Sequence, residues 1–251
     1  MKKAFLVFLA LIMISSVAVA EGAYINIGDY NESVIALHQK LSDLGYFSLR
    51  PESPWSEKSA SALKNVQYVL GLDETGIVAD RTQYDSIMAL DENDPMFKIK
   101  TITAIDEYLS CVKDNGFTVF IAVRDEASNK LKDSTKEILK SMGLQLDWND
   151  NRFRKAYIAV IENENHVIEE ITAETTTGPA LTTSGSVAGV EYNILSAGAE
   201  NDGGKNCSIV LDGMEWARNQ RGLNIVVVDG NRVIDSVAFD TWGEDNAIAI
   251  R

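Results

Sequence analysis

The sequence predicts an α+β protein, with a small three-helix N-terminal domain followed by a β-sheet sandwich domain with flanking helices. Three observations support this fold class. Apolar residues recur at helical spacing between residues 34 and 90. From residue 102 onward, short apolar runs typical of buried strands are interspersed with two helical segments. A hairpin signal, Asp229-Gly230-Asn231 between two apolar runs, lies close to the end of the sequence.

This hairpin is the clearest strand signal. The run Leu223–Val228 has no polar residue after Asn224, which is typical of a strand buried on both faces. The turn residues accept the positive φ that a tight hairpin requires. The partner strand spans Arg232–Phe239, and its alternation places four residues on one face: Val233, Asp235, Val237 and Phe239. Two strands do not form a stable sheet alone, so earlier segments must complete it.

Residues 1–20 have the pattern of a secretion signal peptide. Lys2-Lys3 is followed by the apolar stretch Ala4–Ile14 and by the small residues Ala18–Ala20, which predict cleavage after Ala20. An uncleaved membrane anchor is the alternative, because the apolar stretch is nearly long enough to cross a bilayer. We therefore expect a secreted or cell-wall-associated protein with no membrane partner after cleavage.

The composition excludes nucleic acid as a partner and leaves the state of the two cysteines open. The formal net charge is −14, and it becomes about −16 once Lys2 and Lys3 are removed. A chain this acidic repels phosphate backbones and anionic lipid surfaces, so nucleic acid is excluded as a partner. The only cysteines, Cys111 and Cys207, are compatible with one disulfide or with two free thiols.

The predicted N-terminal domain spans residues 27–90 and contains three helices. The first helix carries Val34, Leu37, Leu41 and Leu44 at helical spacing and ends at Gly45. The second spans Ser59–Leu70 and ends at Gly71. The third follows Asp80, which is placed to cap its N-terminus.

A polar linker is predicted at residues 91–100, and the second domain at residues 101–251. Its expected helices lie at residues 102–115 and 131–142. Further strands are expected at residues 117–123, 155–161, 167–171, 190–195 and 207–211. The stretch Thr175–Gly189, rich in Thr, Ser, Gly and Ala, is predicted to be a long surface loop.

The N-terminal domain resembles the peptidoglycan-binding-like three-helix domain. The matching positions are Gly28, Val34, Leu37-His38, Leu41, Leu44-Gly45-Tyr46, Ala60, Gln67, Gly71-Leu72, Gly76 and Thr82. The sequence departs from the family at Pro51-Glu52-Ser53-Pro54-Trp55, where the family has Asp-Gly and Phe-Gly turns. The resemblance implies attachment to the cell wall through peptidoglycan.

The second domain resembles the interleukin-like EMT inducer family in two blocks. One block comprises Val123-Arg124-Asp125-Glu126-Ala127-Ser128, Leu131-Lys132-Asp133, Leu139, Met142-Gly143 and Phe153-Arg154-Lys155-Ala156-Tyr157. The other comprises Arg221-Gly222-Leu223-Asn224 and Phe239-Asp240-Thr241-Trp242. In the family the second of these blocks comes first, so we interpret the order as a circular permutation, which requires Trp242 to end near Ile102. The alternative is two unrelated blocks in separate units.

The second resemblance implies a glycan-binding site, with N-acetylglucosamine as one candidate sugar. Carried over by position, the binding residues are Asp125, Arg154 and Arg221, and Trp242 would pack against the sugar ring. Carboxylates accept hydrogen bonds from sugar hydroxyls and guanidinium groups donate to oxygens, which suits a neutral glycan. Trp148 and Trp216 are weaker candidates for the same packing role. The alternative is that the three charged residues form ordinary surface ion pairs.

The sequence does not predict an enzyme, a cofactor or a metal site. Neither His38 nor His166 has a second ligand at metal-binding spacing, and Cys111 lies within a predicted helix rather than beside a histidine. The carboxylates of Asp125, Glu126 and Asp240 leave a peptidoglycan-modifying hydrolase as a minor alternative. The main alternative to glycan binding is a secreted module that binds another protein.

Overall fold

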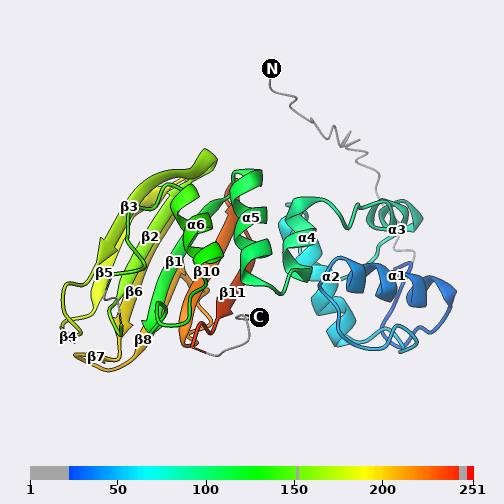
Figure 1. Cartoon of the computed structure of the whole chain (residues 1–251). Coiled ribbons are helices and arrows are strands. Elements are labelled where there is room, and N and C mark those ends of the chain that lie inside the picture. Colours follow the sequence, from blue (N-terminus) through cyan, green and yellow to red (C-terminus); the bar gives the residue numbers. More distant parts are fainter. Residues whose placement is uncertain (1–22, 151–152, 243–247) are drawn as a thin grey trace, which may run out of the picture.

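The computed structural model describes residues 23–150, 153–242 and 248–251. The signal peptide predicted at residues 1–20 lies outside these residues. The fold is α+β, as predicted: a helical region formed by α1 to α4 lies beside a strand-rich region that carries α5 and α6 (Figure 1). None of the helices in the described residues is long and apolar enough to cross a membrane.

The helical region contains the three predicted helices, α1 (Glu32–Asp43), α2 (Glu57–Val69) and α3 (Arg81–Met88). Each begins at a residue whose side chain accepts a hydrogen bond from a backbone N–H of the first turn. The capping residues are Asn31, Ser56 and Asp80. The cap predicted at Asp80 is therefore confirmed.

His38 occupies the interior of the helical region. Its ring is fully buried and stacks between Phe47 and Trp55, at centroid distances of 4.4 and 5.2 Å. Nδ1 lies 3.0 Å from the carbonyl oxygen of Pro51, and Nε2 lies 2.7 Å from Oγ of Ser59. The ring of His38 therefore packs against the segment 51–55, and its burial makes His38 a structural residue.

A fourth helix, α4 (Pro95–Thr101), lies in the segment predicted as a linker. Asp94 caps it, and a proline at its first position is compatible with a helix start. Phe97 and Ile99 are buried, and Gly45 approaches the helix so closely that a Cβ there would lie 2.8 Å from Cβ of Lys100. The segment 91–100 thus packs into the core that joins the helical region to the sheet.

The strand-rich region has two helices and a branched sheet. The helices are α5 (Ile105–Asn115) and α6 (Asp133–Ser141). The longer strands are β1 (Thr118–Asp125), β2 (Tyr157–Glu162), β3 (His166–Thr172), β5 (Leu181–Val187), β6 (Val190–Gly198), β8 (Asn206–Leu211), β10 (Gly222–Asp229) and β11 (Arg232–Phe239). Short pieces complete them: η1 (Asn163–Asn165), β4 (Thr177–Gly178), β7 (Glu200–Asn201), β9 (Met214–Glu215) and β12 (Ala249–Ile250).

The sheet branches at β1. One edge of β1 pairs with β10, which continues into β11 and β12. Its other edge pairs antiparallel with β2 over residues 119–122, but Arg124 and Asp125 pair in parallel with the end of β6. The strands β5, β6, β8 and β9 therefore leave the plane and form a second layer.

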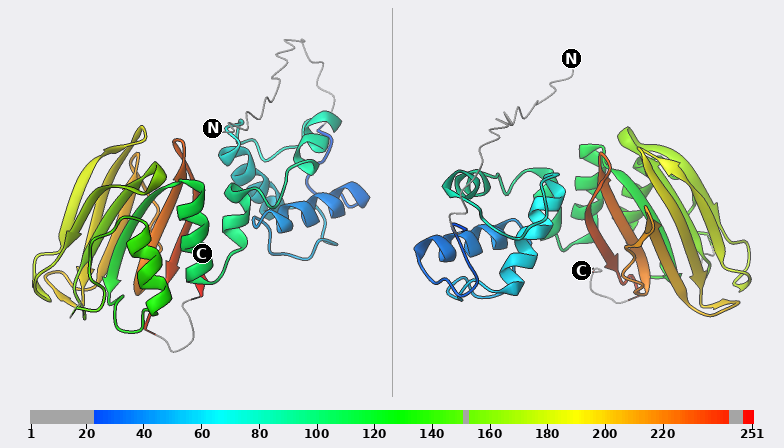
Figure 2. Two further views of the ribbon diagram at one scale, coloured as in Figure 1. Left: turned by 45° about the horizontal axis from the view of Figure 1, so that its top comes forward. Right: turned by 180° about the vertical axis from the view of Figure 1, so that it is seen from behind.

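Two apolar cores result from this branching. On one face of β1, β2, β10 and β11 lie α5 and α6, and this core continues into the helical region. On the opposite face the same strands pack against β5, β6 and β8, with Phe120 and Tyr192 in ring contact at 5.6 Å. Figure 2 shows the second layer from behind, on the side of the sheet without helices. The predicted sandwich with flanking helices is confirmed.

The predicted C-terminal hairpin is present, with one difference on its second strand. β10 and β11 pair antiparallel around Gly230, which has a positive φ of 59°. The register shifts between Val227 and Val228, which is a β-bulge. Val237 and Phe239 face the helices as expected, whereas Val233 packs in the core between the two layers. The prediction that Val233 shares their face is wrong, because the bulge reverses the alternation.

The stretch Thr175–Gly189 is not a loop, which corrects the sequence prediction. It contains β4 and β5, and β5 pairs antiparallel with β6 along its whole length. Thr has a high strand propensity, but the residues of β5 are mostly exposed, so the run lacks the apolar alternation of a half-buried strand. Ala188 and Gly189, both at positive φ, form the turn into β6.

The last described residues lie beside the start of α5. Ile248 forms a bridge with Ala104, and the Ala249 N–H donates to the carbonyl oxygen of Thr103 at 2.9 Å. A circular permutation requires this kind of proximity between the end of the hairpin segment and residues 101–105. The permuted relationship to the family remains a prediction.

The helical region and the sheet also meet through buried polar groups around β11. Asp235 is fully buried, and its carboxylate accepts from Arg251, Lys100 and Tyr108 at 3.1 to 3.4 Å. Burial and the nearby charge of Asp235 raise the pKa of Tyr46. Arg251 also donates through Nη2 to carbonyl oxygens of the segment 99–102. We call this group the Asp235 cluster.

Candidate functional site

The residues proposed to bind a glycan meet at one end of the sheet. Asp125 is the last residue of β1 and has a positive φ of 68°. Arg221 directly precedes β10, whose first residue, Gly222, pairs with Arg124. Because β1 and β10 are antiparallel neighbours, the end of one strand lies beside the start of the other. The topology therefore brings Asp125 and Arg221 together, although they are far apart in the sequence.

Arg221 forms a two-point ion pair at this end. Its Nε and Nη2 donate to the two carboxylate oxygens of Asp240 at 2.9 and 2.7 Å. This hydrogen bonding raises the pKa of Arg221, and the negative charge of Asp125 acts in the same direction. The same contact lowers the pKa of Asp240. The guanidinium also lies over the ring of Trp242, at 5.6 Å from its centroid.

Arg154 reaches the same surface from the segment that precedes β2. It has a positive φ of 60°, and its guanidinium lies 5.0 Å from the ring centroid of Phe153. Its Nη1 donates to Glu200 at 3.3 Å. The rings of Phe153 and Trp242 are neighbours, with centroids 6.1 Å apart. All four predicted residues therefore belong to one group with Phe153 and Asp240, which we call the strand-end cluster.

Asp125 differs from the other members in its exposure. Its side chain is only 11% exposed, and it accepts from Nζ of Lys205 at 2.8 Å. Arg154 and Arg221 have side chains that are 41% and 38% exposed, and Trp242 is 38% exposed. The surface thus presents two guanidinium groups and two aromatic rings to solvent, with the carboxylate of Asp125 at its inner side.

Glu126, which the sequence offered only as a carboxylate of the hydrolase alternative, supports this surface in a way that the sequence did not predict. It is 2% exposed, and Oε1 accepts from the backbone N–H groups of Ser128 and Asn129. Oε2 accepts from the backbone N–H of Arg154. A buried carboxylate therefore ties the segment after β1 to the segment before β2. The sequence did not indicate that Glu126 is buried, because the residue type of a carboxylate does not reveal whether it is buried or exposed.

Two glycines allow the strand ends to approach closely. A Cβ at Gly198 would collide with the carbonyl oxygen of Arg154, and one at Gly222 would collide with the carbonyl oxygen of Phe239. Gly222 also has a positive φ of 98°, which side chains rarely adopt. The backbone is therefore closely packed at Arg154 and directly after Arg221.

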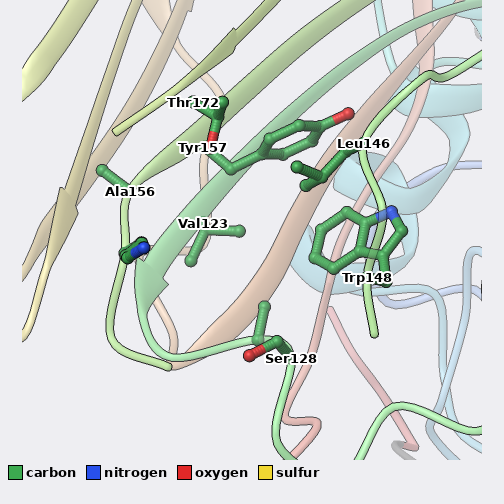
Figure 3. A pocket seen from close by; sticks show the side chains of 9 residues that line it. Val123, Ser128, Leu146, Trp148, Ala156, Tyr157 and Thr172 are labelled. Atoms are coloured by element: carbon green, nitrogen blue, oxygen red, sulfur yellow. The ribbon is translucent and has the colours of Figure 1, made fainter. Parts of the chain in front are cut away.

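The weaker candidates Trp148 and Trp216 lie elsewhere. Trp148 is buried and meets Tyr157 edge to face at 5.0 Å. Trp216 stacks with Tyr68 of the helical region at 6.4 Å. Figure 3 shows Trp148 and Tyr157 beside a small hollow that Val123 and Ala156 also line. Its volume of about 10 Å³ leaves room for about one water molecule, so it does not hold a sugar.

The described part of the chain contains two free thiols and no group of side chains suited to hold a metal ion. Both cysteines are free, Cys111 on α5 and Cys207 buried between the layers. Burial raises the pKa of each thiol, which keeps both protonated near neutral pH. Within residues 23–150, 153–242 and 248–251, His, Cys, Asp and Glu form no group of three or more arranged to hold a metal ion.

Two models of known families match the chain, over residues 30–84 and 65–164. A model described as a peptidoglycan binding domain matches residues 30–84, from just before α1 into α3. The model of the interleukin-like EMT inducer family matches residues 65–164, from within α2 to just past β2. These are the two families inferred from the sequence, in the same order. No curated protein and no solved structure matches the chain.

The second match covers only part of the strand-end cluster. Asp125 and Arg154 lie within residues 65–164, whereas Arg221 and Trp242 lie outside them. The match also begins in the helical region rather than at residue 101. The comparison therefore does not support a permuted assignment of the last two strands, which remains a prediction based on the residues themselves.

Proposed function

We propose that this is an exported, non-catalytic carbohydrate-binding protein that is associated with the cell wall. The helical region would bind peptidoglycan, in keeping with its family match. The strand-end cluster would bind a glycan through Asp125, Arg154, Arg221 and Trp242, and we expect that glycan to contain N-acetylglucosamine.

The observation that carries the glycan proposal is the pairing of exposed aromatic rings with exposed guanidinium groups. Trp242 and Phe153 are each nearly two-fifths exposed and lie side by side. A sugar ring has an apolar face that packs on such rings, while its hydroxyl and acetamide oxygens accept hydrogen bonds. Nη1 of Arg221 has no partner among the described residues, so it is free to donate to a ligand.

The exposure of the cluster also sets the expected affinity. Hydrogen bonds to charged groups contribute roughly 1.5–3 kcal/mol each when they are well formed. At an open surface, water competes for the same donors, and the side chains lose conformational freedom on binding. We therefore expect dissociation constants of about 10 μM to 1 mM for a short oligosaccharide.

Two binding assays on residues 21–251 test the two parts of the proposal. Sedimentation with insoluble peptidoglycan should deplete the protein from solution. Calorimetric titration with N-acetylglucosamine oligomers should give saturable binding. Protein that stays in solution would contradict the role of the helical region, and the absence of heat with every oligomer would contradict the glycan site.

Substitution of Trp242 locates the glycan site. Trp242→Ala removes the larger exposed ring, and we expect an affinity for the oligomer lower by about tenfold, from lost packing and the lost neighbour of Arg221. Ile168→Ala is the matched control, because Ile168 is equally exposed on β3 and its loss should leave the affinity unchanged. Equal affinities of the two variants would place the site elsewhere.

Export and the absence of catalysis need separate measurements. N-terminal sequencing of protein recovered outside the cell should begin at Glu21, and recovery of the intact leader would contradict cleavage. A peptidoglycan zymogram should show no clearing at the position of this protein. A clearing band that disappears in Asp240→Asn would favour the hydrolase alternative.

A further inference from the structure

The strand β5 forms a long free edge on the side of the strand-rich region that points away from the helical region (Figure 1). It pairs antiparallel with β6 over residues 181–187, and no other strand of the described residues pairs with it. Glu169 of β3, in the other layer, accepts from Thr183 of β5 and Tyr192 of β6 at 2.6 and 3.2 Å. β5 is therefore held in its layer, while one side of its backbone is unpaired.

The hydrogen-bond pattern of the hairpin shows which backbone groups are unpaired. Val187 and Val190 flank the two-residue turn between β5 and β6, so they form a hydrogen-bonded pair. Hydrogen-bonded and non-hydrogen-bonded pairs alternate along an antiparallel ladder, so Ser186 and its partner Glu191 share no backbone hydrogen bond. In agreement, the N–H and C=O of Glu191 both bond to Asp212 on the other side of β6, each at 2.9 Å. The backbone groups of Ser186 therefore point away from β6.

By the same alternation, Thr182, Ser184 and Ser186 all direct their N–H and C=O groups to the free side of β5. Within the part of the chain that the structure describes, these N–H groups have no hydrogen-bond partner. The three side chains are small and exposed, and Gly185 between them is exposed as well, so the edge is open to solvent. A strand of seven residues without a charge or a proline lacks the usual protection of a free edge.

The other edges of the branched sheet are short or protected. β9 and β12 contain two residues each. β3 is a long edge, but it carries His166, Glu169 and Glu170, and a register shift interrupts its pairing with β2. Charged side chains and bulges hinder the pairing of an edge with another chain. Among the strands of the described residues, β5 is therefore the edge best suited to accept a further strand.

The sequence of β5 is complementary to itself when a second copy lies antiparallel with Ser184 opposite Ser184. Thr182 then lies opposite Ser186 of the second copy, and each of these facing pairs exchanges two backbone hydrogen bonds. On the exposed face, the β6 residue beside Ser186 is Glu191, and the one beside Thr182 is Leu195. Each Glu191 is thus aligned with Leu195 of the second copy, so this register brings no like charges together on that face.

We propose that β5 pairs with β5 of a second copy of this chain, so that the two sheets join across a two-fold axis. Each copy uses the same edge, which makes the contact self-complementary and limits the assembly to a dimer. The net charge of −14 makes two copies repel each other, so a contact is favoured on a strand that carries no charge. The contact area is small, and we expect a dissociation constant of about 10–500 μM. The site goes beyond the proposed glycan function and uses none of the same residues.

Analytical ultracentrifugation of residues 21–251, from about 1 μM to 1 mM, tests the pairing. We expect a reversible shift from monomer to dimer as the concentration rises. Ser184→Pro removes the central outward N–H and places the proline ring at the edge, but it leaves the hydrogen bonds to β6 intact. This variant should dimerise at least tenfold more weakly. Ser184→Ala is the matched control and should dimerise like the parent protein, because the pairing uses the backbone.

Two double variants test the register without a proline. Thr182→Glu with Ser186→Lys places opposite charges in each facing pair, so we expect the dimer to become about three- to tenfold tighter. Thr182→Lys with Ser186→Lys places like charges there, and we expect the dimer to become about tenfold weaker, although the two lysines reduce the net negative charge of the chain. Two-dimensional NMR spectra of each variant check that it is folded.

Amide hydrogen exchange followed by NMR locates the contact. The N–H groups of Thr182, Ser184 and Ser186 should exchange more slowly as the protein concentration rises, while those of the edge strand β9 should not change. A protein that stays monomeric up to about 1 mM would overturn the proposal and leave the edge to a strand of another protein. A dimer of unchanged affinity in Ser184→Pro or in both double variants would also overturn it, because the contact would then lie elsewhere.

Discussion

The Asp235 cluster and the strand-end cluster lie on or next to β11. Each contains an arginine, an aspartate and an aromatic ring, but the two clusters differ in their exposure to solvent. In the Asp235 cluster, Arg251 pairs with Asp235 and lies 5.9 Å from the ring centroid of Tyr108. In the strand-end cluster, Arg221 pairs with Asp240 and lies over Trp242. The carboxylate side chain is 0% exposed in the first and 35% exposed in the second.

The difference shows that residue types alone do not assign a role to such a group. A buried ion pair loses its hydration, so each partner depends on the other and the group holds neighbouring elements together. An exposed ion pair is screened by water and contributes little to stability, so its donors and rings remain available to a ligand. The Asp235 cluster joins the helical region to the sheet, and the strand-end cluster is free to bind.

The largest expected effect comes from removing the central carboxylate of the buried Asp235 cluster. Asp235→Ala leaves Arg251 and Lys100 without their buried counter-charge, and we expect the free energy of unfolding to fall by about 3–5 kcal/mol. Urea denaturation measures this change. Asp240→Ala is the matched control and should lose about 1 kcal/mol or less. Similar losses in the two variants would remove the distinction between the clusters.

His38 extends the comparison between buried and exposed polar groups. Its ring is buried between two aromatic rings, and we propose that it binds no ligand. His38→Ala removes the ring between Phe47 and Trp55, and Oγ of Ser59 and the carbonyl oxygen of Pro51 each lose one hydrogen-bond partner, so we expect a loss of about 2–4 kcal/mol in unfolding free energy. Calorimetric unfolding measures it. His166→Ala, at a side chain that is 70% exposed, should change stability by less than about 0.5 kcal/mol. A stable His38→Ala protein would contradict the structural role.

A conservative substitution of Arg221 tests the proposed binding role of the exposed strand-end cluster. Arg221→Lys keeps the charge but loses the two-point contact with Asp240 and the flat group over Trp242, so we expect glycan affinity to fall about three- to tenfold. The stability should change by no more than about 1 kcal/mol. Titration and urea denaturation of the same sample separate the two effects. A large loss of stability with unchanged affinity would show that Arg221 belongs with the structural group.

The smallest effect concerns pH. Hydrogen bonding to Arg221 lowers the pKa of Asp240 in the folded protein, so the pair stabilises the fold above the unfolded-state pKa of about 3.9. This contribution is lost as the pH falls through the lowered folded-state value. The stability difference between the parent protein and Asp240→Asn should therefore be small and constant from pH 7 to pH 5 and should shrink only in stronger acid. A difference that grows on acidification would contradict this assignment.

Much of the local structure was predictable because local rules decide it. The helix ends follow from Asp80 and from glycines such as Gly45, and the hairpin follows from Gly230 between two apolar runs. The prediction failed where the local pattern was weak or altered. β5 is mostly exposed and shows no apolar alternation, and the bulge beside Val228 moves Val233 to the other face.

The candidate site was predictable only as a set of residue types. Resemblance to a family indicated Asp125, Arg154, Arg221 and Trp242, and the structure brings them to one end of the sheet. Phe153, Asp240 and the buried Glu126 complete the group, and their part in it depends on which strand ends are neighbours. The Asp235 cluster was not predicted either, because an aspartate in an apolar strand gives no sign of partners from residues 100 and 251.

The amino-acid sequence by itself determined the fold class, most helix and strand positions and the two family resemblances, because these depend on spacing, turn residues and caps within short segments. Only the tertiary structure decided which of the charged residues are buried and which face solvent. That decision depends on the branching of the sheet at β1 and on the packing of the helical region against β11. Both bring together residues that are distant in the sequence, and the free energy of a charge depends on those neighbours rather than on its own segment.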